Sequence, residues 1–164
     1  MSLSVKITTQ VFQTLSDLKK KYGFVELGLA VSGGSDSLAM LYLCKDWAVK
    51  NKIKLRCVTV DHKLRSGSLI EAELVAGHCK KLGINHEIVG WDHEEKLKGN
   101  LSDLARSARY RIIDKWRKNI NFVLVGHTQN DQVETFFMNL KRGSGIEGLK
   151  GMPVSFRRSE GYFI

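Results

Sequence analysis

The stretch Ser32-Gly33-Gly34-Ser35-Asp36-Ser37 follows an apolar run, Val25–Val31, and precedes a helical pattern that begins at Leu38. This order predicts a strand, a tight glycine turn and a helix. Such a turn directs several backbone N–H groups into one small space at the positive end of a helix, where a phosphate is stabilised. Two adjacent glycines allow close backbone approach and positive φ values. The stretch therefore predicts a phosphate-binding turn.

Polar side chains in the same turn strengthen this prediction. The hydroxyls of Ser32, Ser35 and Ser37 add hydrogen-bond donors, and Asp36 offers a carboxylate to a Mg²⁺ ion that accompanies the phosphates. No lysine follows the glycines, so the turn is not the G-x-x-x-x-G-K-[ST] loop, and it is not G-x-G-x-x-G either. The alternative interpretation is a serine-rich helix cap with a glycine pair.

Length and composition limit the class of protein. The chain has 164 residues and a formal net charge of +9. One domain is expected from this length, and the basic excess favours a polyanionic partner, although a lysine-rich soluble surface is the alternative. No apolar stretch is long enough to span a membrane and no signal-peptide pattern opens the chain, so we expect a cytoplasmic protein without a membrane partner.

The cysteines indicate the same compartment. Cys44, Cys57 and Cys79 are widely spaced in apolar surroundings, and no C-x-x-C occurs. They are interpreted as reduced cysteines of the core, and the spacing favours neither a structural zinc site nor a redox dithiol. At the other end of the chain, the segment 157–164 is typical of a turn that enters a new strand. We expect a single domain over residues 1–164, with the polypeptide truncated there.

Helical and strand patterns alternate along the chain, which predicts βαβ units and a parallel sheet, doubly wound with helices on both faces. Ser68 and Glu71 have the spacing of a capping box. The predicted helices cover residues 11–22, 35–51, 68–82, 100–118 and 130–140, and the predicted strands cover 25–31, 53–60, 86–89 and 120–125. Residues 141–151 are predicted to form a glycine-rich loop.

Ligands of such sheets bind beyond the carboxyl ends of the strands. The turns after three predicted strands carry the stretch 32–37, Asp61 with His62, and Gly126 with His127. We therefore expect these residues to meet at one edge of the sheet, where Asp61, His62 and His127 contact a nucleotide. For Asp61 the alternative is a residue that only opens a turn.

Two further pairs have spacings that suit chemistry. Arg106 and Arg109 are one helical turn apart, and two guanidinium groups presented together suit phosphate binding, the alternative being a solvated basic face. Asp131 and Glu134 have the same spacing in the predicted helix 130–140. Their carboxylates suit Mg²⁺ or the ammonium group of an amine substrate, although acids at a helix start also complement the helix dipole.

Taken together, these motifs resemble the tRNA(Ile)-lysidine synthetase family. The stretch 32–37 is similar to the pyrophosphate loop of the N-type ATP pyrophosphatases, to which that family belongs. Residues 60–65, 105–110, 126–135 and the glycine-rich segment 142–152 are similar to four further motifs of the family. The resemblance extends from about residue 25 to 153. It implies a fold of the adenine nucleotide alpha-hydrolase type.

The resemblance also implies an activity. A ligase of this family uses ATP to adenylate C2 of the wobble cytidine in tRNA(Ile) with a CAU anticodon, and free L-lysine then displaces AMP to give lysidine. By resemblance, residues 32–37 bind ATP, Asp36 and Asp131 assist Mg²⁺, and Arg106 or Arg109 contacts phosphate. Asp131 and Glu134 then lie near the lysine amine.

Two features differ from the family. Asn130 stands where an acid is common, and the further tRNA-binding domains of the family are absent from this sequence. The alternatives are another tRNA-modifying or amidating enzyme with a pyrophosphate loop, and a non-catalytic ATP-binding module. The oligomeric state is left open, with a homodimer as one form.

Overall fold

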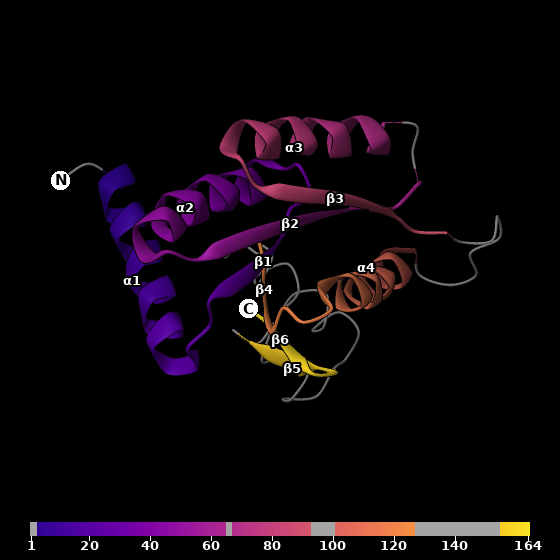
Figure 1. Cartoon of the computed structure of the whole chain (residues 1–164). Helices are drawn as coiled ribbons and strands as arrows, with labels where there is room; N and C mark the ends of the chain where they lie inside the picture. Colours follow the sequence, from indigo (N-terminus) through magenta and orange to yellow (C-terminus); the bar gives the residue numbers. More distant parts are fainter. Residues whose placement is uncertain (1–2, 65–66, 93–100, 127–154) are drawn as a thin grey trace, which may run out of the picture.

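The computed structural model describes residues 3–64, 67–92, 101–126 and 155–164. Its elements alternate from α1 to β4 and end in a short hairpin (Figure 1). The helices are α1 (Leu3–Tyr22), α2 (Ser35–Asn51), α3 (Ser68–Leu82) and α4 (Leu101–Arg117). The strands are β1 (Glu26–Ala30), β2 (Lys54–Asp61), β3 (Asn85–Gly90), β4 (Phe122–Val125), β5 (Phe156–Arg158) and β6 (Gly161–Phe163).

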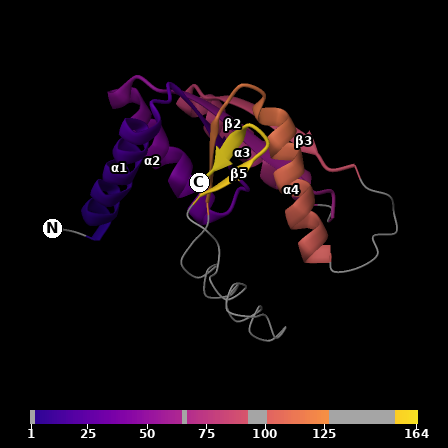
Figure 2. The ribbon, with the colours of Figure 1, turned by 90° about the horizontal axis from the view of Figure 1, so that it is seen from below.

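The strands form one sheet in the order β3-β2-β1-β4-β6-β5. All neighbours pair in parallel except β5 and β6, which are antiparallel. One hydrophobic cluster joins side chains of α1, α2 and α3 to one face of the sheet, and a second joins α4 to the other face. Figures 1 and 2 show α4 apart from α1 and α2 across the strands. The predicted doubly wound α/β fold is confirmed.

The ends of the helices follow their sequence signals closely. Gly23 and Gly83 both have positive φ, 65° and 63°, in the left-handed region that ends a helix. Helix α2 begins and ends at the predicted residues. Helix α1 begins at Leu3 rather than at Val11, so the sequence pattern underestimated its length.

The predicted capping box of α3 is wrong. Gly67 occupies the cap position and no side chain caps the helix, because Ser68 is already its first helical residue. The hydroxyl of Ser68 hydrogen-bonds to Asp61 instead, at the end of β2. The contact to a neighbouring strand therefore replaces the local cap.

Several predictions lie outside the described residues. These are Asn100 as a helix cap, the helix 130–140 and the loop 141–151. The turn and strand predicted near the carboxyl end are confirmed, since residues 159–160 turn into β6. Strand β5 precedes this turn and was not predicted.

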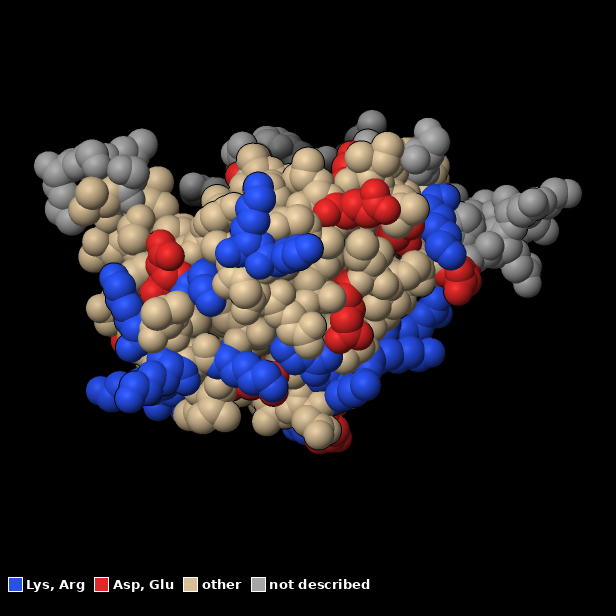
Figure 3. All heavy atoms as spheres, turned by 45° about the horizontal axis from the view of Figure 1, so that its top comes forward, with Lys and Arg blue, Asp and Glu red and all other residues tan. Residues whose placement is uncertain are grey.

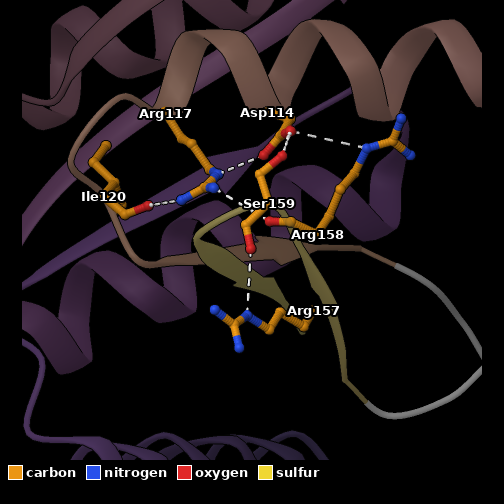
Figure 4. Close-up of polar contacts among 6 residues, drawn as sticks. All are labelled: Asp114, Arg117, Ile120, Arg157, Arg158 and Ser159. Atoms are coloured by element: carbon orange, nitrogen blue, oxygen red, sulfur yellow. Dashed lines mark hydrogen bonds and ion pairs between the residues drawn. The ribbon is translucent and has the colours of Figure 1, made fainter.

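A buried arginine joins the hairpin of β5 and β6 to α4 (Figure 4). Arg117 is 3% exposed, and its Nε donates to Oδ1 of Asp114 at 2.7 Å. Its two terminal nitrogens donate to the carbonyl oxygens of Ile120 and Arg158, at 3.1 and 3.2 Å. Ser159 donates to the other carboxylate oxygen of Asp114 at 2.6 Å. The guanidinium is thus satisfied on every side, which a buried charge requires.

Cys44, Cys57 and Cys79 are all free and buried, as the sequence predicted. Burial raises the pKa of the Cys44 thiol to about 12, so this thiol is unreactive near neutral pH. No helix within the described ranges is long and apolar enough to cross a membrane.

Candidate functional site

The site lies where the sheet reverses its winding. Strand β1 pairs with β2 on one side and β4 on the other, and the crossovers on the two sides use opposite faces of the sheet. Open α/β sheets bind ligands beyond the carboxyl ends of the strands near such a reversal. Gly126, just after β4, packs so closely on the first turn of α2 that an added Cβ would lie 3.3 Å from Cα of Ser37.

A cavity of about 690 Å³ lies at the carboxyl ends of β1, β2 and β4, with α3 and α4 contributing to its walls. Its size falls in the range of small-molecule sites, about 300 to 1,000 Å³. Six elements of the fold and the turns next to them contribute to its walls. The lining includes Ser32, Gly33, Gly34, Ser37, Val58, Thr59, Val60, His62, Leu64, Ser68, Ile70, Glu71, Leu74, Arg109, Ile113 and Gly126.

Ser37 organises the glycine turn from inside. Its hydroxyl oxygen accepts hydrogen bonds from the backbone N–H groups of Ser32 and Gly33, both at 3.2 Å, and donates to the carbonyl of Gly34 at 2.9 Å. Ser37 is only 4% exposed. Its hydroxyl therefore shapes the turn, and because Ser37 also lines the cavity, its predicted contact with a ligand stays a prediction.

The two glycines of the turn are not equivalent. Gly33 has φ of 94°, which a residue with a side chain rarely adopts, whereas Gly34 has φ of −68°. The prediction of positive φ is confirmed for Gly33 and is wrong for Gly34. A Cβ on Gly33 would also lie 3.4 Å from the carbonyl oxygen of Glu71, so this glycine lets the turn pack on α3.

The amino end of α2 is open to an anion. Gly34 is its cap residue and no side chain bonds to the first-turn N–H groups. Because the backbone N–H groups of the first turn have no partner within a helix, they and the helix dipole favour a negative ligand. Ser35 and Asp36 lie on this first turn, are exposed, and are not among the residues that line the cavity.

Arg109 and His62 supply the site's unsatisfied polar atoms. Both residues line the cavity, and both Nε of Arg109 and Nδ1 of His62 are buried without a hydrogen-bond partner among the described residues. Buried donors and acceptors without partners are costly and rare. Their presence in a cavity wall indicates that a ligand with polar groups completes them.

Arg106 behaves differently from Arg109. Both guanidinium groups lie over the ring of Tyr110, at 5.7 and 5.3 Å from its centroid. Arg106 is exposed and does not line the cavity, whereas Arg109 does. The structure therefore separates the pair, and Arg109 is the arginine placed for the site.

Burial, and secondarily the charge of Arg109, lowers the pKa of His62. The imidazole is accordingly neutral near pH 7. Its ring meets Trp91 edge to face, with centroids 5.9 Å apart, which holds its orientation. A neutral, oriented imidazole next to an arginine can hydrogen-bond a ligand without adding charge.

Asp61 is engaged within its own turn. It is 7% exposed and accepts a hydrogen bond from the backbone N–H of Lys63 at 3.0 Å. A hydrogen bond from Ser68 is the largest cause that holds the pKa of Asp61 below its usual range, against the opposing effect of burial. Asp61 does not line the cavity, so its predicted contact with a nucleotide stays a prediction, while its turn role is visible.

The sequence of the chain matches that of a known protein family. A family profile described as a PP-loop domain matches residues 5–164. The chain belongs to the PP-loop family. The match includes the glycine turn, the end of β2, α4 and β4, which together surround the cavity.

The curated relatives of this PP-loop domain include tRNA(Ile)-lysidine synthases. The chain is 44% identical over 131 residues to the one from Wolbachia pipientis wMel, covering 77% of this chain and 30% of that protein. It is 42% identical over 149 residues to the one from Brucella anthropi, covering 85% of this chain and 32% of that protein. The chain thus spans about a third of the length of these relatives.

Solved structures support the fold alone. A U34-tRNA thiolase from Methanococcus maripaludis superposes with a TM-score of 0.65 at 22% identity, covering 75% of this chain and 45% of that chain. An NH3-dependent NAD synthetase from Campylobacter jejuni gives a TM-score of 0.58 at 18% identity, covering 80% of this chain and 59% of that chain. Both confirm the PP-loop type of α/β fold predicted from the sequence.

Three predicted site residues, His127, Asp131 and Glu134, lie outside the described part of this PP-loop domain, as does Asn130, which differs from the family. The contribution of α3 to the cavity wall was not predicted from the sequence. Ile70 and Leu74 line the cavity while remaining 67% and 52% exposed. Two apolar side chains one helical turn apart on the open side of a helix were the available signal, because they provide a surface for a planar group.

Among the described residues, the basic side chains gather at helix ends rather than at the cavity, whose lining includes Arg109. Basic residues end several helices, including Lys19, Lys20 and Lys21 in α1, Lys50 in α2, and Lys80 and Lys81 in α3. These helix ends lie at the amino edge of the parallel strands, opposite the cavity, where cations complement the helix dipoles. On the face drawn in Figure 3, basic side chains form several groups with acidic side chains between them.

Proposed function

We propose that this PP-loop domain binds ATP in the cavity and uses it to ligate L-lysine to C2 of the wobble cytidine of tRNA(Ile), forming lysidine. The identity of 42–44% with tRNA(Ile)-lysidine synthases over most of the chain supports this choice. The same activity is carried by relatives about three times as long, so the proposal concerns the catalytic part of that reaction.

One observation carries the proposal in the structure. The buried Nε of Arg109 and Nδ1 of His62 lack partners among the described residues and line the same cavity as the uncapped amino end of α2. A guanidinium and a helix amino terminus both select phosphate oxygens. A neutral imidazole and the apolar side chains of α3 suit the nucleoside. The arrangement fits a nucleoside polyphosphate better than a simple anion.

The first chemical step follows from this placement. The O2 atom of the cytidine attacks the α-phosphorus of ATP, an O–P bond forms, and the bond from that phosphorus to the bridging oxygen breaks. Pyrophosphate leaves with the electron pair. The N–H groups at the amino end of α2 hold the departing pyrophosphate, and Arg109 stabilises the negative charge that develops on the phosphate oxygens.

The second step consumes lysine. The uncharged ε-amine attacks C2, AMP leaves, and one proton must be removed from the attacking nitrogen. We propose that Asp131 and Glu134 bind the lysine ammonium and assist its deprotonation, because two carboxylates one helical turn apart suit this task. Both residues lie outside the described part of the chain, so this assignment rests on the sequence.

A Mg²⁺ ion fits the same site. Mg²⁺ is held in such sites by one or two carboxylates together with phosphate oxygens and water. Asp36 is exposed on the first turn of α2, so its carboxylate is accessible to an ion on the phosphates. Asp36 would hold an ion there, with Asp131 as a second proposed ligand, and such an ion would neutralise charge on the triphosphate.

The proposed partners are tRNA(Ile) with a CAU anticodon, ATP and free L-lysine, and the proposed compartment is the cytoplasm. With a formal net charge of +9, we expect this domain to bind tRNA mainly through phosphate contacts, which carry no sequence information, and to discriminate poorly among tRNAs. A homodimer stays a prediction.

The function is tested by incubating the chain with tRNA(Ile), ATP, Mg²⁺ and labelled lysine, and measuring both pyrophosphate release and lysine in the tRNA. The proposal expects pyrophosphate release that requires tRNA, and lysine transfer that requires both ATP and tRNA. A tRNA(Ile) transcript with uridine at the wobble position is the control. Tight ATP binding with no tRNA-dependent pyrophosphate release contradicts the proposal and favours a non-catalytic ATP-binding module.

A further inference from the structure

Two cysteines and a histidine that are distant in sequence lie close together on the face of the sheet that α3 covers, next to the cavity. Cys57 is on β2, Cys79 on α3 and His86 on β3, and their potential ligand atoms lie within 4.8 Å of one another. Both cysteines are fully buried and His86 is half-buried. Cys57 and His86 are direct partners in the pairing of β2 with β3, so their side chains leave the same face of the sheet, the face that α3 covers.

A hydrogen bond fixes the histidine. Nε2 of His86 lies 2.9 Å from the hydroxyl of Thr59, which is 3% exposed and stands two residues beyond Cys57 on the same face of β2. When Nε2 carries the proton and donates it to Thr59, Nδ1 keeps a free lone pair. Histidines that bind metals are oriented in this way by a partner on the second ring nitrogen.

We propose that Cys57, Cys79 and His86 bind a Zn²⁺ ion that fastens the edge strand β3 to β2 and α3. Two thiolates and an imidazole form a donor set that zinc prefers, and Mg²⁺ or Ca²⁺ would instead require oxygen ligands. In a tetrahedral zinc site, neighbouring ligand atoms are separated by about 3.5 to 3.8 Å. Contraction of the present cluster by about 1 Å creates that geometry.

The protons and charges of the proposed zinc site balance. Zn²⁺ displaces one proton from each cysteine thiol, the histidine binds as the neutral base, and a water molecule completes the fourth position. A bound ion would link Cys79 to His86 across the turn between α3 and β3, and it would join β2, β3 and α3 at the outer edge of the sheet. Thr59 lies both beside His86 and in the wall of the cavity, so a zinc ion would also brace the cavity.

The chain offers matched variants to test this site. Cys79→Ala and His86→Gln each remove one ligand, and Cys44→Ala removes the remaining buried thiol, which lies on α2 and outside the cluster. The reduced, metal-free chain is titrated with Co²⁺, which reports thiolate ligation by an intense near-ultraviolet band, and Zn²⁺ is then added to displace it. Thermal melting with and without Zn²⁺ provides a second readout, and circular dichroism checks the fold.

We expect one Co²⁺ per chain, complete displacement by Zn²⁺, and a higher melting temperature in Zn²⁺. Cys79→Ala should abolish the thiolate band, His86→Gln should weaken binding at least about tenfold, and Cys44→Ala should change neither. If Cys79→Ala does not fold, His86→Gln and Cys44→Ala decide the question. The absence of a thiolate band in the parent chain overturns the proposal. So does a parent-like affinity in His86→Gln, loss of the band in Cys44→Ala, or a Cys57–Cys79 disulfide that forms equally with and without Zn²⁺.

Discussion

Replacement of Arg109 by alanine should weaken ATP binding specifically. The Nε of this residue is buried in the cavity wall without a partner among the described residues. A charge-assisted bond from this Nε to a phosphate therefore breaks no existing hydrogen bond of that atom. A hydrogen bond to a charged group contributes about 1.5 to 3 kcal/mol. At 25 °C this corresponds to a loss of affinity of about 10- to 150-fold.

Arg106→Ala is the matched control. It removes the same side chain from the same helix, but Arg106 is exposed and does not line the cavity, so the affinity should change by less than about threefold, within the usual range of surface substitutions. Isothermal titration calorimetry with ATP and Mg²⁺ measures both variants, and urea melts confirm that each remains folded. Equal losses in the two variants, or an unchanged affinity in Arg109→Ala, would refute the reasoning.

Three other predictions concern stability and the turn. Arg117→Ala should lower the free energy of unfolding by about 3 to 5 kcal/mol in urea melts, because it removes the buried guanidinium that bonds to Asp114 and to the carbonyl oxygens of Ile120 and Arg158. Burial raises the pKa of Asp114, but the hydrogen bonds of Ser159 and then Arg117 hold it below its ordinary value. The contribution of this ion pair to the free energy of unfolding is therefore complete above about pH 4 and is lost as the pH falls further. Parallel plots of unfolding free energy against pH for the parent and Arg117→Ala would contradict this. Gly126→Ala should weaken ATP binding, because the added Cβ presses on Ser37 next to the glycine turn. Gly77→Ala, which has open space around it in α3, should stabilise the fold by about 0.5 to 1 kcal/mol and leave the ATP affinity unchanged. Similar ATP affinities in both variants would argue against a tight contact at Gly126. Asp36→Ala should keep the melting temperature and lose the Mg²⁺ dependence of ATP binding, and a retained dependence would remove Asp36 from the metal site.

The parts of the fold that local signals determine were predictable. Helix α2 runs from Ser35 to Asn51, as its pattern predicted, because a glycine turn begins it and strand periodicity resumes at once after it. Gly83 ends α3 at the expected place for the same kind of reason. The alternation of such elements was sufficient to predict the parallel sheet and the edge at which the glycine turn, His62 and Gly126 lie around one cavity.

Tertiary contacts decided what the sequence could not. The spacing of Arg106 and Arg109 made them equivalent, and only the packing of α4 on the sheet places one in the cavity and the other in solvent. Ser68 looked like a helix cap, but it bonds to Asp61 because the end of β2 lies beside it.

The cysteines show the same limit of local reasoning. The absence of C-x-x-C argued against a metal site on the basis of sequence spacing. The parallel pairing of β2 with β3 nevertheless brings Cys57 and His86 side by side, and α3 adds Cys79 from above. Ligands contributed by three separate elements leave no signature in a single sequence, since their proximity depends on strand register and helix packing.

We propose above all that the cavity at the carboxyl ends of β1, β2 and β4 binds ATP with its phosphates at the amino end of α2. A crystal structure of the chain with Mg²⁺ and an ATP analogue that carries a methylene bridge between its α- and β-phosphates tests it most directly. We predict phosphate oxygens within hydrogen-bond distance of the backbone N–H groups of Ser35 and Asp36 and of the guanidinium of Arg109, with the base over Ile70 and Leu74 of α3. An analogue bound elsewhere, or bound in the cavity with its phosphates directed away from α2, would contradict this mode of ATP binding.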